Sequence, residues 1–336
     1  MESFNIIFTG VNQVATSQES LPEPGPQEVL IEARKSLIST GTEGICLGRL
    51  FDPGTHWDQW VKYPFHPGYS MSGVIRAIGS EVQHFKVGDR VAAPVNHRQF
   101  SLTDTNNLFP IPDGISDEDA AWFHLAHITQ TGVRRAEHIL GEDVALIGLG
   151  LLGQLVTQYL RLLGARQIIA IDPAEKRLRM AQEHGATTVL AHTAETARKI
   201  VLDLTEGQGV NIVYDITGIA PVFPAAIKLL RRFGRLLLLG DTGSPGSQQL
   251  TGDVITKGLR IIGAHDGNAP SESNDYAYWD KKRMVEVFFT YLQRGDMRVD
   301  NLVTHRFSPQ QAPDAYRVLR EERATIMGIV FDWTKL

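Results

Sequence analysis

The chain has 336 residues, of which 43% are hydrophobic and 21% charged, and its formal net charge is −5. Length and composition predict an ordinary globular protein of two domains, each with enough apolar residues for a core of its own. The negative charge, without any basic run, argues against nucleic acid or an anionic membrane as a partner.

The sequence also indicates the cellular compartment in which we expect the protein. Its single cysteine, Cys46, excludes a disulfide framework and a multi-cysteine metal site within the chain. No apolar stretch approaches the roughly 18 residues that span a bilayer. The first five residues lack the layout of a secretion signal. We expect a cytoplasmic protein; the alternative is a secreted protein whose signal has been removed.

The first third of the chain is rich in β-type segments separated by glycine and proline. Strands are expected at residues 29–39, 68–79 and 90–95, with turn-rich pieces such as 22–26 and 86–89 beside them. This region has no apolar periodicity of helical length. The pattern favours a compact, antiparallel, barrel-like domain.

The pattern changes after residues 110–114. Ser116 followed by Asp119 is typical of a helix start, and the helix is expected to reach about residue 139. From Asp143 onward, short apolar runs alternate with amphipathic segments, as in a parallel sheet covered by helices on both faces. The expected strands are 144–147, 167–171, 212–216, 235–239 and 259–263, and the expected helices include 151–163 and 174–184.

After about residue 265 this alternation weakens. Helices are expected at 280–294 and 310–321, followed by a closing strand at 326–331. A tail of about 70 residues would form only a marginal core alone, so we expect it to join the first domain. The predicted domains are therefore residues 1–123 with 266–336, and residues 124–265.

The strongest local signal is the run Gly148-Leu149-Gly150-Leu151-Leu152-Gly153, which follows an apolar strand and opens a helix. Gly148 would permit a tight turn, Gly150 would let the backbone approach a pyrophosphate, and Gly153 would let the helix pack closely on the strand. The N–H groups that open the helix would bind the phosphates. The run predicts a dinucleotide site; the alternative is a glycine-rich turn without nucleotide.

Asp172 ends the second strand of this unit, about 20 residues after the glycine run, where a carboxylate accepts hydrogen bonds from the adenosine ribose. It would also repel a 2′-phosphate, which favours NAD(H) over NADP(H), although Lys176 and Arg177 lie nearby in the sequence. Asp172 could equally cap the helix after Pro173. The predicted cofactor-binding set is completed by Arg177, Thr217, Gly240 and His265.

Five motifs together resemble the medium-chain dehydrogenase/reductase superfamily. They are Gly-Thr-Glu at 41–43, Pro-Gly-Tyr-Ser-Met-Ser-Gly-Val at 67–74, Val-Gly-Asp-Arg-Val at 87–91, the glycine run at 148–153 and Asp-Ile-Thr-Gly at 215–218. The resemblance implies an α/β protein in which a GroES-like β-barrel catalytic domain is joined to a Rossmann domain with a doubly wound parallel sheet. It also implies an oxidoreductase with a nicotinamide cofactor.

Within that superfamily, the chain is similar to bacterial sugar-oxidising enzymes of the glycoside (guloside) 3-dehydrogenase type. This similarity rests on the Gly-Thr-Glu motif, on Gly-Val-Arg at 132–134 and on the runs at 278–283 and 326–329. Bacteriochlorophyllide dehydrogenases share a similar Gly-Thr-Glu pattern.

The resemblance also implies where a catalytic zinc would bind. It places Thr40 and Tyr69 where zinc-dependent members have a cysteine and a histidine ligand, and Phe123 or His124 at the third ligand. Threonine and neutral tyrosine are poor zinc ligands, and the four-cysteine structural zinc lobe is absent from the sequence. We expect no metal. The alternative is a non-standard site formed by histidines 66, 97, 124 and 127.

Without zinc, side chains must handle the hydroxyl proton of the substrate. The superfamily's proton-relay hydroxyl maps onto Thr42, and Tyr69 could donate a hydrogen bond to a developing alkoxide. His124 or His127 could act as acid or base, and each could instead be a structural histidine. Glu43 could orient an active-site neighbour or cap a turn. The aromatic residues Trp57, Trp60 and Tyr63 could line a substrate pocket or belong to the core.

The leading hypothesis is an NAD-dependent sugar, polyol or glycoside dehydrogenase without zinc, acting on a small polar molecule. The second is an NAD(P)H-dependent quinone or enone reductase, and the third is a non-catalytic dinucleotide-binding sensor. By analogy with relatives, we expect a homodimer or homotetramer that pairs through residues 259–265.

Overall fold

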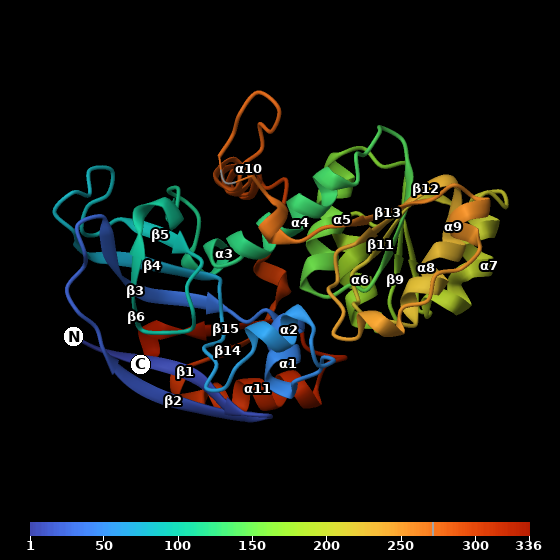
Figure 1. Ribbon diagram of the computed structural model, residues 1–336. Coiled ribbons are helices and arrows are strands. Elements are labelled where there is room, and N and C mark those ends of the chain that lie inside the picture. The colour runs from blue at the N-terminus through green and yellow to red at the C-terminus, as the bar shows by residue number, and fades with distance from the viewer. Residues whose placement is uncertain (271) are drawn as a thin grey trace. The chain divides into compact units, whose positions relative to one another are not determined.

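The computed structural model describes residues 1–270 and 272–336 (Figure 1). It consists of two compact units. The first comprises Met1–Leu125 and Lys282–Leu336, and the second comprises Ala126–Lys281. Each unit is built around its own sheet, and in each the apolar side chains of the strands form the core.

The first unit contains a β-hairpin and a seven-stranded sheet. The hairpin pairs β1 (Glu2–Gly10) with β2 (Gln13–Ser20). The sheet has the order β14-β15-β3-β4-β5-β7, with β6 paired to β3, and only its β14–β15 pair is parallel among the described strands. The bounds are β3 Glu28–Leu37, β4 Met71–Ile78, β5 Arg90–Ala93, β6 Phe100–Asp104, β7 Phe109–Pro110, β14 Val303–Phe307 and β15 Gly328–Asp332.

The helices of the first unit correct two sequence expectations. The first third was expected to lack helices, yet α1 and α2 lie there, and the single helix expected from 116 to 139 is two helices, α3 and α4. Ala121 and Trp122 separate them, and Glu137 at φ 53° follows the end of α4. Among the described residues, no helix has the length and apolar character to cross a bilayer. The bounds are α1 Thr40–Gly48, α2 His56–Trp60, α3 Asp117–Ala120, α10 Lys281–Arg294 and α11 Ala312–Glu321, and α4 Phe123–Arg135 begins in the first unit but lies mostly in the second.

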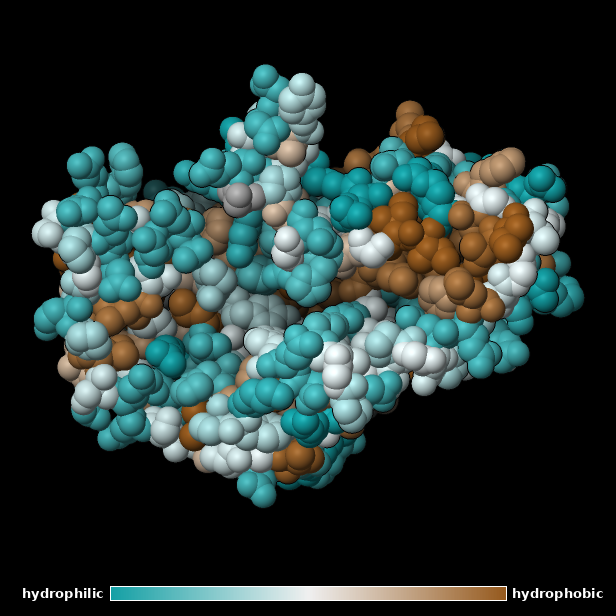
Figure 2. All heavy atoms as spheres, in the orientation of Figure 1, coloured by the Kyte–Doolittle hydropathy of each residue, from teal (hydrophilic) through white to brown (hydrophobic). Residues whose placement is uncertain are grey.

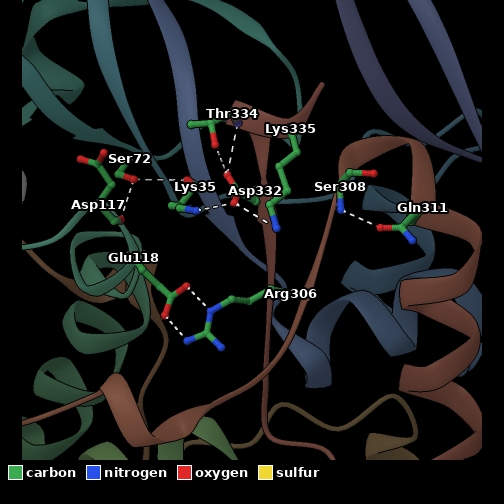
Figure 3. A network of polar contacts seen from close by, with 10 residues as sticks. All are labelled: Lys35, Ser72, Asp117, Glu118, Arg306, Ser308, Gln311, Asp332, Thr334 and Lys335. Atoms are coloured by element: carbon green, nitrogen blue, oxygen red, sulfur yellow. Dashed lines mark hydrogen bonds and ion pairs between the residues drawn. The ribbon is translucent and has the colours of Figure 1, made fainter.

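Polar contacts join the C-terminal segment to the N-terminal strands (Figure 3). The Lys35 ammonium on β3 lies 2.8 Å from the Asp332 carboxylate at the end of β15. Arg306 on β14 donates two hydrogen bonds to Glu118 on α3, at 2.7 and 2.6 Å. Because β15 also pairs with β3, the last strands of the chain extend the sheet formed by its first third.

The second unit is a six-stranded parallel sheet of order β10-β9-β8-β11-β12-β13. Figure 1 shows α5 and α6 on one side of the sheet and α7, α8 and α9 on the other. The order reverses between β8 and β11, and the carboxyl ends of strands at such a point form the ligand crevice of doubly wound sheets. The bounds are β8 Asp143–Ile147, β9 Gln167–Ile171, β10 Thr188–Leu190, β11 Val210–Asp215, β12 Leu230–Leu238, β13 Arg260–Gly263, α5 Leu151–Leu162, α6 Glu175–Glu183, α7 Ala194–Leu204, α8 Val222–Leu229 and α9 Asp253–Thr256.

The Lys35–Asp332 pair predicts a pH-dependent contribution to stability. Burial opposes ionisation of Asp332, but Lys35 and Thr334 outweigh it and lower the pKa of the carboxyl. The contribution is therefore complete above the unfolded-state pKa of about 3.9 and is lost as pH falls through the lower folded-state pKa. We expect Asp332→Asn to reduce the free energy of unfolding by about 1 kcal/mol at pH 7 and to have little effect near pH 2.

Thermal denaturation across this pH range measures the effect. The control is Asp203→Asn, which breaks an exposed Lys199–Asp203 pair and should change stability little at any pH. A loss for Asp332→Asn that stays constant down to pH 2 would contradict the assignment.

Candidate functional site

The loop between β8 and α5 contains three glycines with different surroundings. Gly148 has φ 93°, and a Cβ there would lie 2.9 Å from Cγ2 of Thr217. A Cβ on Gly153 would lie 2.3 Å from the carbonyl oxygen of Gly148, so α5 contacts the loop backbone directly. A Cβ on Gly150 would meet no atom within 4 Å among the described residues. The space above Gly150 is therefore open to a ligand.

The same loop leaves the start of α5 available to an anion. Gly150 is the N-cap of α5, and as a glycine it makes no side-chain capping bond at this end. Leu151, Leu152 and Gly153 form the first turn, whose N–H groups have no partner within the helix. The helix dipole adds partial positive charge at this end. Loop and helix together could hold the phosphates of a dinucleotide.

Asp172 follows β9 and is nearly buried, with 3% of its surface exposed. One carboxylate oxygen accepts a hydrogen bond from the Leu149 N–H, and the other accepts one from the Ala174 N–H, both at 2.8 Å. Arg177 lies 3.6 Å from the first oxygen. Asp172 therefore ties the glycine loop to the start of α6. Each oxygen keeps a second lone pair for a ligand hydroxyl.

The other predicted cofactor residues lie at the carboxyl ends of neighbouring strands. After β11, Thr217 donates to the Asp215 carboxylate at 2.7 Å. After β12, a Cβ on Gly240 would lie 2.5 Å from the Gly218 nitrogen, so the two loops touch. After β13, the pKa of His265 is raised by its hydrogen bond to Asp266. The structure thus brings this set to one end of the sheet, apart from Arg177, which lies on α6.

In the first unit, three predicted residues lie together around one phenol. The Tyr69 hydroxyl donates to Oγ of Ser39 and lies 3.3 Å from Oγ1 of Thr42. The Tyr69 and His124 rings are in contact, with centroids 5.0 Å apart. Ser39 is the N-cap of α1, and sequence reasoning missed it. This hydroxyl cluster, made of Ser39, Thr42 and Tyr69 with His124 beside it, can donate and accept protons.

Glu43 lies behind the hydroxyl cluster and is 1% exposed. Its Oε1 accepts from the Ser39 N–H at 2.8 Å, and its Oε2 accepts from the Tyr316 hydroxyl at 2.5 Å. Oε2 also lies 3.1 Å from Nε2 of His97. Burial, and then the charge of Glu43, raises the pKa of Tyr316 well above its usual value, so Tyr316 remains a donor. Glu43 therefore reaches the cluster through Ser39.

The remaining predicted residues are not part of the hydroxyl cluster. His127 lies one turn beyond His124 on α4, in the second unit, and is 1% exposed. His97 faces Glu43 and Ser36. Across residues 1–270 and 272–336, no group of three or more His, Cys, Asp or Glu residues is placed to hold a metal ion.

Sequence comparison finds matches to known families over both units. Residues 25–113 match the family described as "Alcohol dehydrogenase GroES-like domain", and residues 152–279 match the family described as "Zinc-binding dehydrogenase". The chain is 26% identical to an L-threonine 3-dehydrogenase of Pectobacterium atrosepticum, with 93% of this chain and 89% of that protein covered.

Structural comparison finds the same fold in solved structures. Galactitol-1-phosphate dehydrogenase from Escherichia coli superposes with a TM-score of 0.82 at 21% identity, covering 99% of this chain and 100% of the other. A zinc-binding dehydrogenase homologue from Sinorhizobium meliloti, bound to NADP, superposes with a TM-score of 0.80 at 19% identity, covering 99% of each chain. At these identities, the likeness establishes the fold.

Because Gly150 and Gly153 have different surroundings, substitution by alanine should have a different effect at each. Gly150→Ala should leave the melting temperature unchanged but weaken NADH binding by at least about tenfold, because its methyl group would occupy the space open to the pyrophosphate. Gly153→Ala should lower the melting temperature, because its Cβ would clash with backbone.

Fluorescence titration with NADH and thermal denaturation measure the two effects. Gly246→Ala is the control, since a Cβ there also meets no described atom within 4 Å. Full NADH affinity in Gly150→Ala would show that no dinucleotide approaches this loop.

Proposed function

Because the chain belongs to the medium-chain dehydrogenase/reductase superfamily, we propose that it is a zinc-independent, NAD(H)-dependent oxidoreductase. It transfers a hydride between nicotinamide and a hydroxyl-bearing or carbonyl carbon of a sugar, polyol or glycoside. The glycine loop carries this proposal, because it combines an open approach at Gly150 with a helix start whose N-cap is a glycine.

The residues of the first unit would handle the proton. In alcohol oxidation, the C–H bond breaks and its electron pair leaves with the hydride, while the hydroxyl proton passes to a base. Bound nicotinamide supplies the two-electron acceptor or donor. Tyr69 would accept the proton of the reacting hydroxyl while its own proton passes to Ser39 or Thr42. The neighbouring His124 imidazole would be the base that finally holds the proton. In the reverse direction, Tyr69 would donate the proton to the developing alkoxide.

The residues present do not fit a catalytic zinc. The resemblance assigns the ligand positions to Thr40, Tyr69 and either Phe123 or His124, which offers at most one imidazole and no thiolate. Zinc in proteins prefers thiolate, imidazole and carboxylate ligands. Tyr69 instead donates its proton to Ser39. No step of the proposed reaction therefore uses a metal.

The choice of NAD(H) rests on the balance between Asp172 and Arg177. The Asp172 carboxylate would repel a 2′-phosphate, whereas the Arg177 guanidinium, 3.6 Å away, would attract one. The carboxylate contacts the loop directly, because it accepts the Leu149 N–H. The NADP bound in the Sinorhizobium meliloti structure is an observation against a preference for NAD(H).

Substitutions at these two residues test the cofactor preference. Asp172→Ala should weaken NADH binding by roughly tenfold and reduce discrimination against NADPH. Asp172→Asn keeps an oxygen for the Leu149 amide, so it separates loss of charge from loss of loop support. Arg177→Ala should weaken NADPH binding more than NADH binding. Unchanged affinity of Asp172→Ala for both nucleotides, measured by fluorescence, would remove the assigned role.

The substrate class is supported by an aromatic surface and by the similar proteins. Trp60 is 50% exposed, and its ring lies 5.8 Å from that of Trp57; aromatic faces of this kind suit sugar rings. L-threonine and galactitol 1-phosphate, named for two similar proteins, both carry hydroxyl groups. The quinone or enone reductase and the non-catalytic sensor remain the alternatives.

An absorbance assay with sugars, polyols and quinones tests the activity. We expect NAD-dependent turnover of a polyhydroxy substrate, without stoichiometric zinc by elemental analysis. Tyr69→Phe should lower kcat about 10- to 100-fold with unchanged NADH affinity, because it removes the proton-handling group. Tyr276→Phe, which changes a fully exposed phenol, is the control. NADPH-dependent quinone turnover would favour the reductase, and tight NADH binding without turnover would favour the sensor.

The edge of the second sheet supports an oligomer. Strand β13 ends the strand order, and Ile261 on it is 37% exposed. Figure 2 shows hydrophobic residues gathered over this part of the second unit, and Leu250 and Ile255 are 71% and 87% exposed. An exposed edge strand with apolar neighbours is a surface for pairing. The protein is proposed to be a cytoplasmic homodimer or homotetramer through residues 259–265; a monomeric mass by light scattering would contradict this.

A further inference from the structure

We propose that Ser39 is a positioning residue that orients the Tyr69 hydroxyl for proton transfer, and that the buried Glu43 and His97 hold Ser39 in this role. The inference rests on the proposed function, because it concerns the proton that Tyr69 exchanges with substrate. It gives Ser39 the further task of orienting the phenol, and it adds His97, which had no assigned part in the reaction.

The first observation is that Ser39 does not use its hydroxyl as an N-cap serine normally does. An N-cap serine accepts a hydrogen bond from an N–H of the first helical turn and so stabilises the helix. Ser116 does this on α3, where its Oγ accepts from the Asp119 N–H at 3.0 Å. Ser39 has extended backbone at the N-cap of α1, yet within the described residues its side chain makes no such bond. Its Oγ instead accepts from Tyr69.

The second observation is that Glu43 fixes the backbone of Ser39 on both sides. The Ser39 N–H donates to Oε1 of Glu43 at 2.8 Å, and the Glu43 N–H donates back to the Ser39 carbonyl at 2.9 Å. These two bonds fix the backbone of Ser39 without using its hydroxyl. The hydroxyl is therefore held in place for Tyr69. A phenolic proton directed at Ser39 would orient the Tyr69 oxygen to accept a hydrogen bond from a substrate hydroxyl.

The third observation is that Glu43 is itself fixed by buried donors. A buried carboxylate requires hydrogen-bond partners, and Tyr316 and His97 supply them. His97 is oriented by Oγ of Ser36 at 2.8 Å, which accepts from Nε1 of Trp333 at 2.9 Å. When Nδ1 of His97 accepts from Ser36, the protons of Trp333, Ser36 and His97 all point toward Glu43. The direction of the Tyr69 hydroxyl thus depends on a network that extends to the C-terminal segment.

Kinetics of serine variants test the proposal. Ser39→Ala should lower kcat about tenfold while NADH affinity and substrate KM stay close to wild type, because the phenol remains but loses its orientation. Ser39→Thr keeps a hydroxyl and should retain most of kcat. The matched control is Ser116→Ala, which removes a serine that does cap its helix; it should lower the melting temperature and leave kcat unchanged. Glu43→Gln, which places an amide against the same donors, should reduce kcat as Ser39→Ala does.

A double-mutant cycle separates this inference from the proposed function. If Ser39 acts through Tyr69, then Ser39→Ala combined with Tyr69→Phe should be no slower than Tyr69→Phe alone. Multiplied losses, or full activity of Ser39→Ala beside an impaired Tyr69→Phe, would overturn the role of Ser39 only. Full activity of Tyr69→Phe, or no turnover by the wild-type protein, would overturn the proposed function and this inference with it.

Discussion

The proposed chemistry depends on the close approach of α5 to the end of β8. Gly153 lies against the carbonyl of Gly148 at a distance that no side chain permits, and this contact sets the position of the helix start. The amide groups of the first turn then face the space above Gly150. Asp172 reinforces the arrangement by accepting the Leu149 N–H, so the residue proposed to choose the cofactor also shapes the loop. Cofactor preference and loop geometry are therefore coupled.

In the first unit, the buried carboxylate of Glu43 is fixed in place by its hydrogen-bond partners. Glu43 would be costly in the core without partners, and its partners come from three separate parts of the chain: Ser39, His97 and Tyr316. Such a network holds its members rigidly, because moving one member leaves another buried donor or acceptor unsatisfied. Rigidity of this kind is what a proton-transferring hydroxyl requires.

Sequence patterns were sufficient where local chemistry decides the structure. The strands β8 and β9 were placed to within one residue, because strands buried on both faces appear as continuous apolar runs. The hairpin strand β2 was missed, because its residues are mostly polar and exposed. Helix α1 was missed because it contains three glycines, which disfavour helix; its Glu43 contacts are tertiary and leave no local pattern.

Some residues of the candidate site could be predicted from the sequence, and others could not. The glycine run and Asp172 were recognisable because a dinucleotide site is built from consecutive elements. Thr42, Tyr69 and His124 were placed through a family resemblance, and the structure brings them together. Ser39, His97 and Tyr316 could not be given their roles from sequence. Glu43 is 54 residues from His97 and 273 from Tyr316, and no periodicity links residues so far apart.

The pairing of β15 with β3 has a consequence for how the chain reaches its native state. The second unit is one continuous segment, so all of its strands are available as soon as that segment has been synthesised. The first unit is interrupted. On one side of β3, β6 pairs with residues 28–32, but residues 35–37 have no strand partner until β15 emerges nearly 300 residues later. During synthesis, an exposed edge strand of this kind invites pairing with other chains. The nascent first unit thus keeps part of β3 open until the end of synthesis, whereas the second unit can complete its sheet from one segment.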